Sequence, residues 1–462
     1  MQNRRALAFT LLLCNLNSII RAQTATSIQL TLSKAIEESL KNYPAIQVSQ
    51  EQVNAAAAEI QLARTAYLPR IDALAQFNRA TRNNVFGLLL PQNVIPSMSG
   101  PVIGTNNLGS VWGSAVGALV TWEPFDFGLR GANVATARAM RTQSGAASRR
   151  TQFDVSVATA DAFLTVIAAG RTVQAAQAGV DRTETLVRIV TAHVKAQLRP
   201  GADQSRAEAE SAAARTQLAQ AQQALAISRA TLAQFVGSDP SQIALVPGAL
   251  VRLPPEAAPT PLNTAVNPLA LEQSAMVEQA RAQLRALERT YFPRFLLQAA
   301  AYSRGTGAEL DGQRLGGLNG LAPNVQDYAL GFSVTFPILD LPALHAREAA
   351  QGATIRAQVA KSEQIAVDLR ADWNRAVATL NGARQIAGNT PIQVSAAKTA
   401  TDQATARYQA GLANIDELAE AQRLSTQAEI DDAIARLGVW RGLLRIATAA
   451  GDLQPFLLEA MQ

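Results

Sequence analysis

The stretch "VWGSAVGALVTWE", residues 111–123, decides which folds this sequence can adopt. Its side chains alternate: one face begins at Trp112 and ends at Trp122, while the other carries small or polar residues such as Gly117 and Thr121. A period of two predicts a β-strand, and residues ten apart on a strand are separated by roughly 33 Å. On a strand tilted by about 40° this projects to about 25 Å, the height of the lipid-facing band of a membrane β-barrel.

A second stretch, "YALGFSVTF" at 328–336, shows the same alternation, with Tyr328 and Phe336 at the two ends of its apolar face. Further strands are expected over about 69–80 and 292–304. Four strands cannot close a barrel, because about eight is the practical minimum. Open sheet edges are not tolerated in lipid. The missing strands must therefore come from other copies of the chain; two copies reach the minimum and three supply twelve strands.

The chain repeats one structural unit. Three pairs of segments match in the same order: "YLPRIDALAQF" (67–77) with "YFPRFLLQAAAY" (291–302), "VTWEPFDFG" (120–128) with "VTFPILDLP" (334–342), and "AQLRPGADQSRAEAE" (196–210) with "ARYQAGLANIDELAE" (406–420). The last pair matches Gly201 to Gly411. We divide the chain into a first repeat over 23–250 and a second over 251–462. Each is predicted to run helix, strand, strand, long helix, tight turn and returning helix. The expected bounds are helices over about 32–66, 129–197, 203–236, 264–289, 344–407 and 414–450, strands over about 69–80, 110–123, 292–304 and 327–337, and turns near 199–203 and 409–414.

The long helices have the spacing of coiled coils. Apolar residues recur at alternating steps of four and three, including Leu369, Trp373, Ala376 and Leu380. Alanine supplies much of the 48% hydrophobic content and aromatic residues only 5%, which suits close-packed helices. A helix of about 60 residues is about 90 Å long, beyond any compact domain. A structural periplasmic coiled coil shares this pattern but lacks the alternating strands, and a diffusion porin would spend most of its length on strands.

Residues 1–22 have the pattern of a secretory signal. Arg4 and Arg5 precede an apolar core, and Ala22 is a plausible residue before the cleavage site. The apolar run is far below the ~20 residues of a membrane-spanning helix. Cleavage would remove three arginines and no acids, which lowers the net charge from +5 to +2 and removes the main support for nucleic-acid binding. Cys14, the only cysteine, would leave as well, which excludes disulfides and thiol catalysis from the mature chain.

No group of residues predicts catalysis. His193 and His345, the only histidines, lie in different halves and lack cysteines or acids at metal-ligand spacing. The segment "GTGAELDG" (305–312) is rich in glycine, but no lysine or helix start follows to hold a phosphate, so it is interpreted as an extracellular loop. The sequence therefore predicts no enzyme activity, no metal site and no cofactor.

In their order and extent these features resemble the TolC-type outer-membrane efflux family. The resemblance rests on "LTLSKAIEESLKNYPAIQVSQEQVNAAAAEIQLARTAYLPRIDA" (30–73), "PFDFG" (124–128), the duplicated plan and the turn "RYQAGLANIDEL" (407–418). It implies an α+β membrane protein, a homotrimer whose twelve strands form one barrel in the outer membrane, with a long α-helical coiled-coil tunnel across the periplasm. It also implies the exit duct of a tripartite efflux or type I secretion system, which exports drugs, toxic solutes or polypeptides. The implied partners are a periplasmic adaptor, an inner-membrane pump and outer-membrane lipid.

The same resemblance implies a gate at the periplasmic ends of the long helices. Gly411 would form the turn, Tyr408 would hold neighbouring helices closed, and Glu417 and Glu420 would ring the opening, with Asp416 beside them. Three copies of these acids around one axis would disfavour joint ionisation, so some of their pKa values should rise.

The remaining assignments concern the surfaces that partners contact. Turn and adaptor-docking positions are Arg199, Gly201, Gly411 and Leu412. Membrane-interface aromatics are Trp112, Trp122, Tyr328 and Phe336. Two positions differ from the family pattern, since Ala413 replaces a basic residue and Ala207 an acid. The residues that could substitute for a salt bridge there are Asp203, Arg206 and Glu208.

Overall fold

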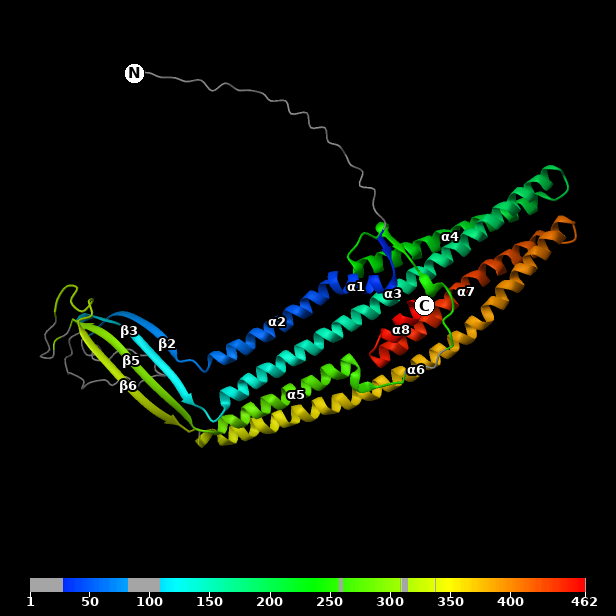
Figure 1. The fold of residues 1–462 in the computed structure, drawn as a ribbon. Coiled ribbons are helices and arrows are strands. Elements are labelled where there is room, and N and C mark those ends of the chain that lie inside the picture. Colours follow the sequence, from blue (N-terminus) through cyan, green and yellow to red (C-terminus); the bar gives the residue numbers. More distant parts are fainter. Residues whose placement is uncertain are drawn as a thin grey trace, which may run out of the picture.

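The computed structural model describes residues 28–81, 109–256, 261–307, 309, 315–336 and 338–461. The signal sequence expected at 1–22, and most of the loop expected between the first two strands, lie outside these residues. A curved sheet forms one end of an elongated molecule, and long helices extend from it to two hairpin turns at the opposite end (Figure 1).

The order helix, strand, strand, long helix, returning helix occurs twice. The first half contains β1 (Ile28–Leu30), α1 (Leu32–Asn42), α2 (Pro44–Thr65), β2 (Arg70–Thr81), β3 (Ser110–Phe125), α3 (Leu129–Lys195), α4 (Gly201–Val236) and β4 (Ile243–Leu245). The second half contains α5 (Pro268–Glu288), β5 (Arg294–Thr306), β6 (Val325–Thr335), α6 (Leu341–Gln409), α7 (Ile415–Ala450) and α8 (Gln454–Met461). Most described residues are therefore helical, and the two halves share one plan.

The prediction of a single helix over 32–66 is wrong at residue 43, where the helix is interrupted. Tyr43 has φ −73° and ψ 123°, an extended conformation, and separates α1 from α2. The cause is Pro44, the first residue of α2, because a proline disfavours helical backbone in the residue before it. Pro391 lies inside α6 without ending it.

The strands of the large sheet pair antiparallel in the order β2-β3-β5-β6. Its registers place Ile71 beside Val120, Val120 beside Ala299, and Ala299 beside Leu330, so one apolar row crosses all four strands. This face is exposed, and Leu330 has 77% of its surface accessible. The opposite face carries small and polar residues, among them Asp72, Gln76, Gly117, Gln298 and Asp327. Within the described part of the chain, nothing packs on the apolar face of this sheet, and the outer edges of β2 and β6 pair with no other strand.

A second small sheet was not expected from the sequence. β1 pairs parallel with β4, which places Leu30 beside Leu245. Beside it, α1, α3, α4, α7 and α8 enclose a core that includes Leu30 and the buried Trp440. The indole N–H of Trp440 donates to the carbonyl of Arg252 at 3.0 Å, so its one polar group is satisfied. The small sheet and this core lie beside the middle of the long helices (Figure 1).

Two arginine clamps join α3 to α7, which belong to different repeats. Arg182 of α3 donates to both carboxylate oxygens of Glu429 at 3.2 Å. Arg441 of α7 donates to both oxygens of Asp161 at 2.7 and 3.1 Å. Each helix supplies one arginine and one acid. Among the described helices, α3 alone is long and apolar enough to cross a membrane by composition, and half of its apolar window is buried against such neighbours, as in a core helix.

Candidate functional site

The two hairpin turns at the helical end have the same backbone geometry. The N–H of Leu198 donates to the carbonyl of His193 at 2.9 Å, and the N–H of Leu412 donates to that of Arg407 at 2.8 Å. The residue before each leucine is left-handed: Gln197 has φ 57° and Gly411 has φ 77°. This is a common way for a helix to end, and glycine adopts it without strain.

The match of Gly201 to Gly411 is wrong. Gly201 is the first residue of α4, whereas the residue equivalent to Gly411 is Gln197. Matching the two glycines gives the wrong register, because in the first turn the left-handed position is occupied by a glutamine, Gln197. The corrected register pairs Asp203 with Glu417, each the third residue of its helix, and Arg199 with Ala413.

Arg199 joins the two turns. Its guanidinium lies 4.8 Å from the centre of the Tyr408 ring. Its Nη2 donates to the carbonyls of Tyr408 at 3.3 Å and Ala413 at 3.2 Å. Ala413 stands where the family pattern has a basic residue, and the arginine that contacts its carbonyl comes from the first repeat.

Tyr408 is buried, with 1% of its surface accessible. It packs in an apolar cluster with Leu186, Val190 and Leu418. Among the described residues its hydroxyl has no hydrogen-bond partner. Burial raises the pKa of Tyr408, and the nearby carboxylate of Asp203 adds to the rise. The phenol therefore stays neutral and able to donate.

The three acids of the proposed gate each lie beside an arginine of the same chain. Asp416 is 3.4 Å from Arg206 of α4, which is a cross-helix pair at one of the substitute positions. Glu417 is 3.5 Å from Arg407, and its backbone N–H donates to the Asn414 side chain at 2.9 Å. All three acids are exposed, so these pairs add little stability.

Glu420 is paired within its own helix. Its carboxylate accepts hydrogen bonds from Arg423 at 2.6 and 3.0 Å. That hydrogen bond lowers the pKa of Glu420. Within one chain the pKa of Glu420 is therefore lowered, whereas a raised pKa is expected where three copies of the acids meet. That raised pKa stays a prediction about the trimer.

Although residue 207 is alanine, the first turn still has an acid nearby, Asp203. Ala207 is fully buried in the cluster around Tyr408, where a carboxylate would be costly. In the corrected register the first-turn acid is Asp203.

Two leucines dominate the exposed surface of the turns. Leu198 is 71% and Leu412 is 72% accessible, and the two occupy equivalent positions. The sequence comparison missed Leu198 because it aligned the glycines. The position of a leucine directly after the left-handed residue is the signal that could have found it.

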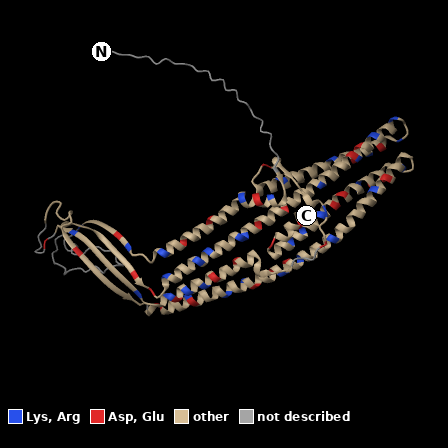
Figure 2. Cartoon of the chain, viewed as in Figure 1, with Lys and Arg blue, Asp and Glu red and all other residues tan. Residues whose placement is uncertain are grey.

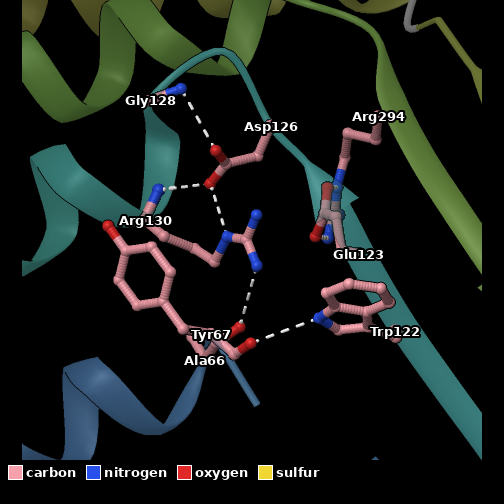
Figure 3. Close-up of polar contacts among 8 residues, drawn as sticks. All are labelled: Ala66, Tyr67, Trp122, Glu123, Asp126, Gly128, Arg130 and Arg294. Carbon is pink, nitrogen blue, oxygen red and sulfur yellow. Dashed lines mark hydrogen bonds and ion pairs between the residues drawn. The ribbon is translucent and has the colours of Figure 1, made fainter. Parts of the chain in front are cut away.

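The expected interface aromatics lie on the large sheet or at its ends. Trp122 donates its indole N–H to the carbonyl of Tyr67 at 3.2 Å, where the sheet meets the helices (Figure 3). Trp112 lies toward the other end of β3, 5.2 Å from the guanidinium of Arg79. Tyr328 is 83% accessible and Phe336 is also exposed. Their relation to a membrane stays a prediction.

A cluster of phenylalanines at the helix side of the sheet was not predicted. Phe127 stacks on Phe292 at 5.1 Å between ring centres and meets Phe125 edge-on at 4.6 Å. Phe295 lies 6.0 Å from Phe127 and 6.1 Å from Phe332. Three segments far apart in sequence meet here, so alternation within one strand could not reveal the cluster.

A buried ion pair fixes the start of α3 beside the end of α2 (Figure 3). Asp126 and Arg130 are 2.9 Å apart and each side chain is 9% accessible. Arg130 also lies 4.8 Å from the Tyr67 ring centre and donates to the carbonyl of Ala66 at 3.4 Å. Burial acts to raise the pKa of Asp126, but hydrogen bonds from the Arg130 side chain and from the N–H groups of Arg130 and Gly128 outweigh it and lower the pKa.

Metal chemistry has no visible basis in the described part of the chain, where no three His, Cys, Asp or Glu side chains group as metal ligands. His345 instead lies 5.5 Å from the Tyr291 ring.

Comparison with known proteins gives a consistent result. A family model described as "Outer membrane efflux protein" matches residues 35–238 and 264–452. The outer-membrane channel OprN is 18% identical, with a TM-score of 0.70, 91% of this chain covered and 89% of that chain. VceC of Vibrio cholerae is 17% identical, with a TM-score of 0.69 and coverage of 91% and 96%. CusC is 14% identical, with a TM-score of 0.74 and coverage of 92% and 93%. No curated protein matches the sequence.

Proposed function

The chain belongs to the outer membrane efflux protein family, and from that premise we propose that three copies form the exit duct of a tripartite efflux or type I secretion system. It is an outer-membrane channel protein that extends into the periplasm, and its family consists of transport ducts rather than enzymes. The proposed cargo classes are drugs, toxic solutes or polypeptides.

The large sheet carries this proposal. Its apolar face is exposed across four strands, and among the strands that the structure describes none pairs with the outer edges of β2 and β6. In a bilayer such edges need partners, and the β6 edge of one copy can pair with the β2 edge of the next. Three copies supply twelve strands, enough for a closed barrel. The helices would then continue as a tunnel beneath it.

The turns at the far end are the proposed gate. Three copies of Asp416, Glu417 and Glu420 would crowd one axis, while Tyr408, buried between helices of the two hairpins, would hold neighbouring helices closed. Leu198 and Leu412 are exposed at the extreme end, where apolar side chains suit a protein partner. We propose that they dock the periplasmic adaptor, together with Arg199, Gly201 and Gly411 in the two turns.

Cysteine cross-linking tests the trimer directly. Cys14 is the only cysteine in the sequence and lies in the expected signal, so introduced cysteines would be the only thiols of the mature protein. Ala73→Cys on β2 combined with Leu330→Cys on β6 should yield species of up to three chains with a short bifunctional thiol reagent in outer-membrane fractions.

Ala73→Cys combined with Arg229→Cys on α4 is the matched control, since α4 lies away from the sheet (Figure 1). That pair should stay monomeric under the same conditions. A soluble periplasmic monomer, uncrosslinked in the β2–β6 variant, would overturn the proposed duct.

A further inference from the structure

A recess of about 280 Å³ lies where the sheet meets the helices. It forms where β3 leads into α3, α5 leads into β5, and β6 leads into α6. Basic and acidic residues gather at this junction (Figure 2). The recess is lined by Arg289, Arg294 and Arg347, by Asp126 and Asp340, and by the ring of Phe292.

Two of the charges in this recess are already neutralised. Asp126 is held by Arg130 and two backbone N–H groups. Arg294 donates to both oxygens of Glu123 at 3.0 and 2.9 Å (Figure 3). Neither residue is free to bind another group strongly.

Arg289 and Arg347 are different. Both are exposed, and among the described residues neither forms an ion pair with a carboxylate. Arg289 lies 5.8 Å from the Phe292 ring centre, which leaves the edge of its guanidinium available. Asp340 also forms no ion pair with a described residue, so the unpaired groups leave the recess with a net positive charge.

The recess belongs to the polar side of the sheet. Arg294 and Glu123 alternate with Phe295 and Trp122, which lie on the apolar face, so the Arg294–Glu123 pair lies on the opposite face. In the proposed barrel that face lines the channel. The inference that follows rests on the proposed duct.

We propose that this recess binds an oxyanion, the carboxylate or phosphate group of a solute, as the solute passes from the helical tunnel into the barrel. Guanidinium groups present paired N–H donors that match two oxygens of such a group, and Phe292 offers an apolar wall beside them. Three copies place six unpaired arginines around the neck of the channel. The neck therefore attracts anions, whereas the acids at the far end attract cations.

The test is block of single channels by tripolyphosphate, a multivalent oxyanion, added from the barrel side in a planar bilayer. The wild-type trimer should be blocked, and Arg289→Gln/Arg347→Gln should weaken block at least tenfold. The effect should shrink as salt rises, because exposed charges are screened. Arg289→Lys/Arg347→Lys keeps the charge and should preserve anion preference while weakening block less than the glutamine pair.

Arg229→Gln removes an exposed arginine far from the recess and should leave block unchanged. Heat-stable trimers of the glutamine pair on gels confirm that it folds. Equal block of the wild type and the glutamine pair, or an unblocked wild-type channel that still conducts, overturns the oxyanion site alone. A purified trimer without any conductance overturns the proposed duct and the site together.

Discussion

Arg199 of the first repeat covers the ring of Tyr408 of the second, with its guanidinium 4.8 Å from the ring centre. The same guanidinium donates to two carbonyls in the second turn. The other polar link between the hairpins near this end, from Arg206 to Asp416, is exposed and longer. Among the described residues, Arg199 is therefore the main polar link between the two turns themselves.

Arg199→Ala should loosen the turns. The change removes a cation–π contact of about 0.5–2 kcal/mol and two hydrogen bonds of about 1 kcal/mol each. We expect higher single-channel conductance and faster proteolysis at the turns. Arg206→Ala is the control, because an exposed pair contributes about 0–1 kcal/mol. Equal effects of the two changes would contradict the special role of Arg199.

Glu417→Ala/Glu420→Ala should reduce cation selectivity and weaken block by trivalent cations from the periplasmic side. The reason is that three copies of these acids in the proposed trimer would concentrate cations at a narrow opening. Bilayer recording of reversal potentials measures the first effect and titration with a trivalent cation the second. Wild-type selectivity and block in the double variant would show that these acids are only solvated side chains.

Tyr408→Phe should raise conductance and leave cation selectivity unchanged. Tyr408 is buried between helices of the two hairpins and its hydroxyl has no partner among the described residues, so we expect it to find its acceptor on a neighbouring helix when the tip closes. The same bilayer recordings separate this variant from the glutamate pair. Unchanged conductance would mean that the hydroxyl holds no neighbour.

Asp126→Asn should make stability less dependent on acid. The folded-state pKa of Asp126 is lowered, so its stabilising effect is fully present above its unfolded value of about 3.9 and is lost as the pH falls through its folded pKa. The melting temperature of the wild type should therefore fall more steeply below about pH 4 than that of the variant. If the melting temperatures of the two proteins depended on pH in the same way, the lowered folded-state pKa of Asp126 would be contradicted.

Leu330→Arg should impair membrane insertion more than Trp112→Arg or Trp122→Arg. An arginine on the lipid face costs about 2–4 kcal/mol at the middle of the bilayer and about 0–1 near its surfaces. Outer-membrane yield of the three variants provides the ranking. Quenching of Trp112 and Trp122 by lipids brominated at known depth should place both at interfaces, and water-exposed signals from both would contradict the girdle.

The sequence was informative wherever a feature repeats locally. Alternation of period two located the strands of the large sheet, and spacing of three and four located the long helices, since each pattern gathers apolar side chains on one face of its element. The break at Pro44 was also readable, but the helical pattern on both sides obscured it. Pairing of β1 with β4 joins two three-residue strands across the first repeat, and no local pattern encodes it.

The candidate site was predictable in part. Gly411 marked its turn because a left-handed position favours glycine, but Gln197 fills the same position without that signal. The arginine partners of the acids depend on side chains from different helices. The phenylalanine cluster and the proposed oxyanion recess each assemble from three segments far apart in sequence, so only the folded chain brings their residues together.

The parallel pairing of β1 with β4 also constrains the order in which parts of the chain can fold. A chain that emerges amino end first presents Leu30 long before Leu245, and at about 5–20 residues per second the wait is roughly 10–40 s. Throughout that interval Leu30, part of the central core, lacks the strand that covers it. The core around Leu30 also takes side chains from α7 and α8, among them Trp440 and Phe456. The nascent first half therefore exposes apolar surface until β4, and after it the end of the second half, have been made.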